Sequence, residues 1–164
     1  MTIILKNKHT LQIGSFCFRC SVGKNGVFKK KKEGDKRTPK GIFRIENLYY
    51  RKDRVKKLQS TLKKIKITKK MGWCDDPNDK KNYNKLVKTS IKSKFEKLYR
   101  KDHKYDLVIP IKYNFDKIIN GLGSCIFLHI TRNYNPTAGC IAISQKDFLI
   151  MLKLIDKKTK IKIL

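Results

Sequence analysis

The stretch Ile126-Phe-Leu-His-Ile-Thr-Arg-Asn-Tyr-Asn-Pro-Thr-Ala-Gly-Cys-Ile-Ala-Ile-Ser144 decides the fold of this chain more than any other segment. Two short apolar runs, residues 124–130 and 140–143, are rich in the β-branched and aromatic residues typical of strands. The ten residues between His129 and Cys140 include asparagine, proline and glycine, and they predict a loop. We therefore expect a histidine at the end of one strand and a cysteine at the start of the next.

His129 and Cys140 are candidates for nucleophilic catalysis, because an adjacent imidazole favours the reactive thiolate of a cysteine. If the two strands are neighbours, the loop can bring the side chains to about 3 Å from each other. The small residues of Thr137-Ala-Gly139 leave room for a substrate carbonyl beside the backbone N–H groups of Gly139 and Cys140, which would form an oxyanion hole. Residue types alone leave an alternative open, since buried cysteines and lone histidines are common in protein cores.

The remaining pattern predicts a mainly β fold, a sandwich or barrel-like arrangement with a C-terminal helix and few short helices. Strands are expected over residues 2–6, 11–22, from 42 onward, and over 105–113, where Pro110 suits an edge or a bulge. Residues 47–104 are charged and weakly periodic, with a short helix expected near 91–101.

The C-terminal segment predicts a helix followed by a last strand. Ser144 is expected to cap the helix, with Asp147 three residues further on. The spacing of the apolar residues predicts a buried stripe of Phe148, Met151, Leu152 and Ile155. No linker rich in proline, glycine or serine divides the 164 residues, so we expect a single domain over 1–164.

A net charge of +28 has two explanations: electrostatic attraction to an anionic polymer or membrane surface, or a lysine-rich compositional bias without a function. The basic residues are mostly lysines spread along the chain, with one cluster at Lys29–Lys32. Readers of nucleic-acid sequence favour arginine, so a specific nucleic-acid partner is not expected. No apolar stretch reaches membrane-spanning length, and the N-terminus lacks the apolar core of a secretory signal, which leaves the localisation open.

The five cysteines, at positions 17, 20, 74, 125 and 140, are odd in number and irregular in spacing, so a full disulfide framework is not expected. Cys17-Phe-Arg-Cys20 has the spacing of half a zinc site, but the sequence has no second pair of this kind. We expect no metal and no cofactor, with a zinc-supported structural domain as a minor alternative.

Further motifs follow one another along the chain: Glu33-Gly-Asp-Lys-Arg-Thr-Pro-Lys-Gly-Ile-Phe43, Gly72-Trp-Cys-Asp-Asp-Pro77, Tyr83-Asn84, Tyr99-Arg-Lys-Asp102, Tyr105-Asp106, Tyr113-Asn114, and Gly123-Ser-Cys-Ile-Phe-Leu-His129 leading to Pro136-Thr-Ala-Gly-Cys140. In these motifs the chain resembles, along most of its length, the L,D-transpeptidase catalytic-domain family, also called YkuD-like. Each motif is weak alone, and their common order makes the resemblance specific.

The resemblance implies an enzyme that acts on peptidoglycan stem peptides or muropeptides, with Cys140 as nucleophile and His129 as base. It implies that the backbone carbonyl of Ile130 orients the imidazole. Cys140 would attack the carbonyl that joins a diamino acid to the terminal D-alanine of a tetrapeptide stem, and an amine of a second stem would resolve the thioester. Substrate carboxylates are expected at Arg132 and Arg100, and the residues expected to line the donor groove are Trp73, Asp75, Asp76, Tyr83 and Asn84.

The sequence departs from the commoner family pattern around the histidine. That pattern has glycine after the histidine, a longer gap to the cysteine and a second histidine two residues before it, where this chain has Ile130, ten residues and Ala138. The chain resembles a short-loop subgroup with a Thr-Ala-Gly-Cys signature. A carboxypeptidase that uses the same Cys/His pair, and more distantly a basic module that binds nucleic acid or another polyanion, are the alternatives.

Overall fold

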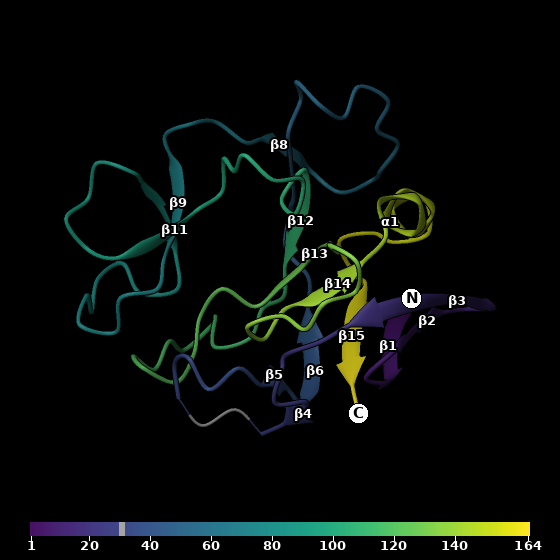
Figure 1. Cartoon of the computed structure of the whole chain (residues 1–164), viewed down its shortest axis with the longest axis horizontal. Helices are drawn as coiled ribbons and strands as arrows, with labels where there is room; N and C mark the ends of the chain where they lie inside the picture. The colour runs from purple at the N-terminus through teal and green to yellow at the C-terminus, as the bar shows by residue number, and fades with distance from the viewer. Residues whose placement is uncertain (30–31) are drawn as a thin grey trace.

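The computed structural model of the chain describes residues 1–29 and 32–164, so part of the lysine cluster at 29–32 lies outside the described residues. Within that range the chain forms fifteen strands and one helix (Figure 1). In chain order they are β1 (Thr2–Asn7), β2 (Thr10–Ile13), β3 (Phe16–Ser21), β4 (Val27–Phe28), β5 (Thr38–Pro39), β6 (Gly41–Arg44), β7 (Leu48–Tyr50), β8 (Lys64–Lys66), β9 (Met71–Cys74), β10 (Leu86–Lys88), β11 (Phe95–Lys97), β12 (Leu107–Pro110), β13 (Phe127–Ile130), β14 (Ile141–Ile143), α1 (Gln145–Leu152) and β15 (Lys160–Ile163).

Ten strands form one sheet in the order β6-β15-β1-β2-β3-β14-β13-β12-β7-β8. The segment 41–50 belongs to both halves of this sheet. Its first part, β6, pairs with β15, and the residues just after it meet the end of β12 through the bridge between Ile45 and Ile111. The sheet therefore curls around its own core, and the expected mainly β, barrel-like fold is confirmed.

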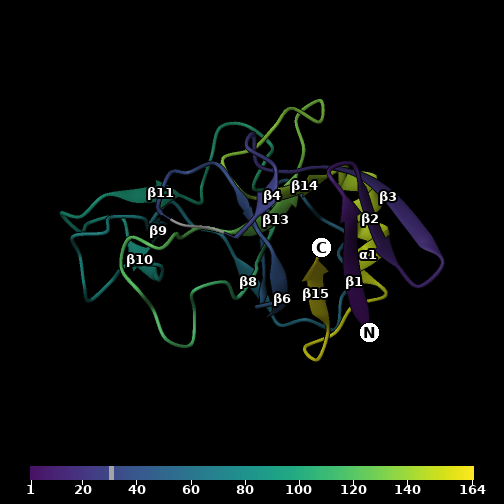
Figure 2. The same cartoon turned by 90° about the horizontal axis from the view of Figure 1, so that it is seen from below.

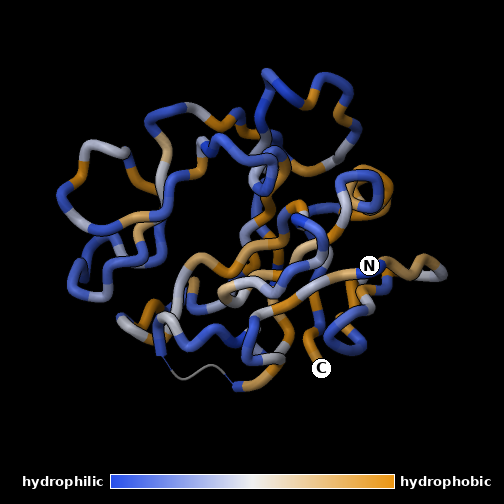
Figure 3. The backbone as a smooth tube through the Cα atoms, in the orientation of Figure 1, coloured by the Kyte–Doolittle hydropathy of each residue, from blue (hydrophilic) through white to orange (hydrophobic). Residues whose placement is uncertain are grey.

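Two apolar clusters lie on opposite faces of the central strands, because successive side chains of a strand alternate between faces. On β13, Leu128 and Ile130 join the larger core, whereas Phe127 joins a second cluster with Trp73 and Tyr105. This second cluster connects the large sheet to a three-stranded sheet, β10-β9-β11, which lies to one side of the molecule (Figure 2). The apolar segments concentrate in the strands of the large sheet, while the outer loops are hydrophilic (Figure 3).

The helix α1 begins and packs as the sequence predicts. Ser144 is the N-cap, and its hydroxyl accepts the N–H of Asp147 at 3.1 Å. The expected stripe of Phe148, Met151, Leu152 and Ile155 is buried in the larger core, with Ile155 just beyond the end of the helix. The last strand, β15, then pairs in parallel with β1 and holds the two ends of the chain together.

The predicted strand over residues 11–22 is wrong in one respect, because the structure has a hairpin there. Strands β2 and β3 pair antiparallel with Ile13 opposite Phe16, which leaves a two-residue turn that begins at Gly14. Gly14 has φ +54°, a conformation that glycine adopts without a steric cost.

The helix expected near 91–101 is also wrong. Strand β11 lies there and pairs with β9 so that Phe95 faces Cys74. The Phe95 ring packs on the backbone of Gly72, where an added Cβ would lie 2.5 Å from the ring. Because Gly72 has no side chain, the Phe95 ring can pack on β9, and this contact favours a strand over a helix at residues 95–97.

Pro110 ends β12, an interior strand rather than an edge strand. Positions 45 and 49 are four residues apart in sequence, whereas their partners 111 and 108 are three apart. The pairing therefore contains one extra residue at this point. Pro110 therefore lies beside a bulge, which is one of the two placements that the sequence predicts.

Candidate active site

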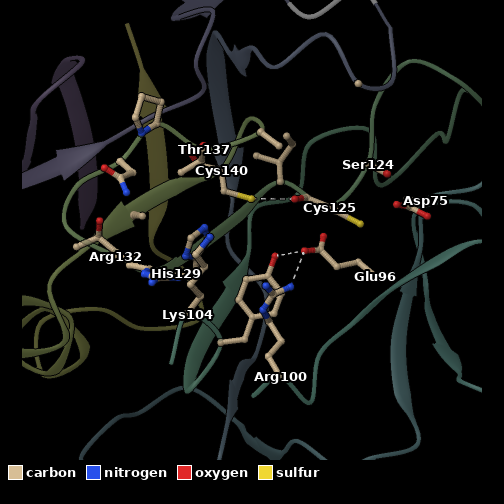
Figure 4. Close-up of a pocket in the computed structure, with 18 of the residues that line it drawn as sticks. Asp75, Glu96, Arg100, Lys104, Ser124, Cys125, His129, Arg132, Thr137 and Cys140 are labelled. Carbon is tan, nitrogen blue, oxygen red and sulfur yellow. Dashed lines mark hydrogen bonds and ion pairs between the residues drawn. The ribbon is translucent and has the colours of Figure 1, made fainter. Parts of the chain in front are cut away.

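His129 and Cys140 lie on the same face of the large sheet. Strands β13 and β14 are parallel neighbours, with His129 opposite Ala142. Cys140 is two residues before Ala142 and therefore points to the same face as His129. Both side chains are buried, and both line one pocket (Figure 4).

The imidazole of His129 is fixed in one tautomer. Its Nδ1 lies 2.8 Å from the carbonyl oxygen of Ile130, the contact expected from the sequence. Because a carbonyl only accepts hydrogen bonds, Nδ1 carries the proton and Nε2 keeps its lone pair. Burial lowers the pKa of His129 to about 4, an effect that the bond to Ile130 opposes and the charge of Lys104 reinforces. The ring is therefore neutral near pH 7 and able to accept a proton.

The thiol of Cys140 has backbone partners on two sides. Its Sγ lies 3.1 Å from the carbonyl oxygen of Cys125, to which the S–H donates, and 3.4 Å from the backbone nitrogen of Phe127, whose N–H points at the sulfur. Cys125 has φ +53°, an uncommon conformation for a residue other than glycine, and its N–H donates to Asn84 Oδ1 at 3.2 Å. These restraints hold the Cys125 carbonyl beside the Cys140 thiol.

The turn before Cys140 is held by two threonines. The buried Thr38 hydroxyl donates to the Gly139 carbonyl at 2.9 Å and accepts the Gly23 N–H at 2.8 Å. Thr137 Oγ1 accepts the Gly139 N–H at 3.1 Å and donates to the Cys140 carbonyl at 2.6 Å. Gly139 has φ +145°, and an added Cβ would lie 2.9 Å from the Arg37 carbonyl oxygen, so the close approach requires glycine.

The pocket around this pair has a volume of about 600 Å³ and carries opposite charges at its two ends. Figure 4 shows Arg132, Lys104 and His129 on one side of Cys140, with Glu96 beside Cys125 and Asp75 beyond it on the other side. The lining also includes Glu33, Lys94 and Arg100.

The family model of the L,D-transpeptidase catalytic domain, YkuD, matches residues 1–163. The chain belongs to this family. Membership of the L,D-transpeptidase family implies an enzyme that acts on peptidoglycan. A comparison with curated proteins and a comparison with solved structures each gave no match.

Of the groove residues expected for this L,D-transpeptidase domain, only Asp75 lines the pocket. Trp73 and Asn84 are buried behind the wall, where Trp73 Nε1 donates to Asn84 Oδ1 at 3.0 Å. Tyr83 is also buried, and its hydroxyl donates to Glu33 at 2.5 Å. Asp76 closes a turn by accepting the N–H of Asn78 at 3.0 Å. These four residues support the pocket and do not form its surface.

The two arginines expected to bind carboxylates line the pocket in different states. Arg100 is engaged by Asp102 through two bonds of 2.9 and 2.7 Å, and this pairing raises its pKa. Arg132 is exposed on the loop after β13, and within residues 1–29 and 32–164 no carboxylate forms an ion pair with it. Arg132 is therefore the cation better placed to meet a ligand.

Several residues that line the pocket were not predicted from the sequence: Glu33, Lys94, Glu96, Lys104, Tyr105, Ser124 and Cys125. Glu33, Tyr105, Ser124 and Cys125 lie within the motifs that carry the family resemblance, so their place in those motifs was the available signal. Lys94, Glu96 and Lys104 stand outside them, in a charged segment that gives no comparable signal.

No group of three or more His, Cys, Asp or Glu side chains suited to a metal ion occurs among the residues that the structure describes. Cys17 is exposed on β3 and Cys20 is buried on the same strand. In the same described range no helix is long and apolar enough to cross a membrane.

Proposed function

We propose that the protein catalyses cysteine-dependent acyl transfer on peptidoglycan stem peptides through a thioester on Cys140. The observation that carries the proposal is the placement of two groups in one pocket and on one face of the sheet: a buried, neutral His129, fixed by the Ile130 carbonyl, and the Cys140 thiol. Family membership supports the substrate class. The carbonyl takes the orienting role that a carboxylate has in other triads.

In the first half of the reaction the thiol attacks the carbonyl carbon between the diamino acid and the terminal D-alanine of a donor tetrapeptide. The S–H leaves its bond to Cys125 and gives its proton to Nε2 of His129 as the C–S bond forms. Backbone N–H groups of Gly139 and Cys140 stabilise the oxyanion, for which the Gly139 N–H must turn from Thr137 Oγ1. Collapse of the intermediate breaks the C–N bond, and His129 returns the proton to the leaving amine.

In the second half an amine of another stem attacks the thioester. His129 accepts the proton of the amine, the new amide bond forms, and the C–S bond breaks to release Cys140. Water in place of the amine yields a tripeptide, the outcome of a carboxypeptidase that uses the same Cys/His pair.

The experiment incubates the purified protein with a disaccharide-tetrapeptide muropeptide and follows the products by mass spectrometry. We expect loss of D-alanine in the wild type and in Cys17→Ala, which removes an exposed thiol, and no turnover in Cys140→Ala. A cross-linked dimer identifies transpeptidation, and a tripeptide identifies hydrolysis. Unchanged muropeptide in the wild type, or turnover by Cys140→Ala, contradicts the proposal.

A further inference from the structure

The acidic end of the pocket is unusual for this chain. Of its 13 acidic residues, three line the one pocket that holds Cys140, although the chain carries a net charge of +28. These three are Glu33, Asp75 and Glu96, hereafter the acidic end. Figure 4 shows Asp75 beyond Cys125 as seen from His129, and Glu96 beside Cys125 with Arg100 next to it. Two cations, Lys94 and Arg100, line the same pocket, and Arg100 forms an ion pair with Glu96.

The three carboxylates are close enough to affect one another. Burial raises the pKa of Asp75, an effect that Lys94 opposes and the charge of Glu33 reinforces. Burial also raises the pKa of Glu96, which the bond from Tyr105 opposes and the charge of Asp75 reinforces. Arg100 also opposes the rise in the pKa of Glu96, because its Nη1 lies 3.7 Å from Glu96 Oε1. Three carboxylates therefore share this end with two cations, Lys94 and Arg100, and the excess of one carboxylate favours a bound cation.

One acceptor atom in the acidic end has no donor in the described part of the protein. Glu33 Oε2 accepts from the hydroxyls of Tyr83 and Ser124, and Glu96 Oε1 accepts from Tyr105. Asp75 Oδ1, by contrast, is enclosed and has no hydrogen-bond partner among the described residues. An enclosed acceptor without a donor costs about 1–3 kcal/mol, which a donor on a bound molecule would recover.

The direction of the chemistry fixes which part of a substrate reaches this end. His129 must protonate the leaving amine, so the leaving D-alanine and its carboxylate lie on the His129 side, near Lys104 and Arg132. The acyl residue bonded to Cys140 therefore extends the other way, past Cys125 toward Asp75 and Glu96. In the proposed donor this residue is the diamino acid, whose side chain ends in an amine.

We infer that Glu33, Asp75 and Glu96 bind the side-chain ammonium of the donor's diamino acid and so select donors in which this amine is free. The inference rests on the proposed function and assigns the orientation of the donor in the same pocket. The incoming acceptor amine must enter from the His129 side, because the same base accepts its proton. The acidic end therefore contributes to donor specificity and not to acceptor specificity.

The test measures only the first half-reaction, by release of D-alanine, so that no acceptor contributes. Two donor tetrapeptides are compared, one with a free side-chain amine and one with this amine acetylated. We expect wild type to use the free-amine donor about tenfold better in kcat/KM, the scale of one charge-assisted hydrogen bond. Asp75→Asn combined with Glu96→Gln should bring the ratio of kcat/KM between the two donors close to one, mainly through a higher KM for the free-amine donor.

The control is Asp116→Asn, which removes one carboxylate charge from an exposed surface site outside the pocket. It should keep the wild-type preference. If the wild-type protein shows equal kcat/KM for the two donors, this result alone overturns the inference. An equal loss on both donors in the double variant also overturns it, because a steric or folding effect does not depend on the amine. In both cases release of D-alanine that requires Cys140 would leave the proposed function standing.

Discussion

The burial of His129 predicts an acid-sensitive stability that one substitution removes. Its pKa is about 4 in the folded protein and 6.5 for the exposed side chain. Between these values the unfolded chain binds a proton that the folded protein does not, so stability is fully present above the unfolded pKa and falls as the pH is lowered. The slope is about 1.4 kcal/mol per pH unit, which gives a loss of about 2 kcal/mol from pH 7 to 5 and about 3 kcal/mol near pH 4.

The assay is urea unfolding at pH 7, 6 and 5 for the wild type, His129→Gln and His9→Gln. Carboxylates elsewhere titrate in all three proteins, so the difference between their pH profiles isolates the imidazole. We expect His129→Gln to lose about 2 kcal/mol less than the wild type over this range. His9 is exposed, and its substitution controls for the loss of a histidine. Parallel profiles for the wild type and His129→Gln would refute the reasoning.

Three further predictions concern the frame of the site and the surface charge. Thr38→Val leaves the Gly23 N–H and the Gly139 carbonyl without their buried partner, so urea unfolding should show a free energy of unfolding lower by about 3 kcal/mol. A decrease below about 0.5 kcal/mol would contradict the importance of these two hydrogen bonds. Ser144→Ala removes the cap of α1 and should cost about 1 kcal/mol in the same assay, whereas Ser144→Asp, which can still accept the N–H, should restore most of it. Raising the salt concentration should slow activity on intact sacculi more than activity on a soluble muropeptide. The reason is that salt screens the attraction between a chain of charge +28 and an anionic surface. Equal slowing on both substrates would show that the charge does not attract the protein to sacculi.

The part of the fold that local patterns specify was predictable. The apolar runs before His129 and after Cys140 indicate strands because each is short, β-branched and bounded by turn residues. The structure pairs these strands directly, as β13 and β14. Ser144 indicates a helix start for a similarly local reason, since its hydroxyl satisfies an N–H of its own helix.

The misses depend on contacts between distant residues. Phe95 lies in a strand because Gly72, 23 positions earlier, leaves room for its ring, and a charged local sequence does not reveal this. The hairpin at Gly14 was within reach, because glycine at the first position of a two-residue turn is a known hairpin pattern. In the site, Glu33 and Ser124 are joined by a 2.7 Å hydrogen bond across 91 positions, and no spacing rule predicts such a meeting.

A thioester on Cys140 is tested most directly by the intact mass of the protein after brief mixing with a tetrapeptide donor. We expect a mass increase equal to the donor minus D-alanine, located at Cys140 by peptide mapping and absent in Cys140→Ala. Release of D-alanine with no adduct on Cys140, or an adduct on Cys125 or Cys17 that persists in Cys140→Ala, would contradict the thioester on Cys140.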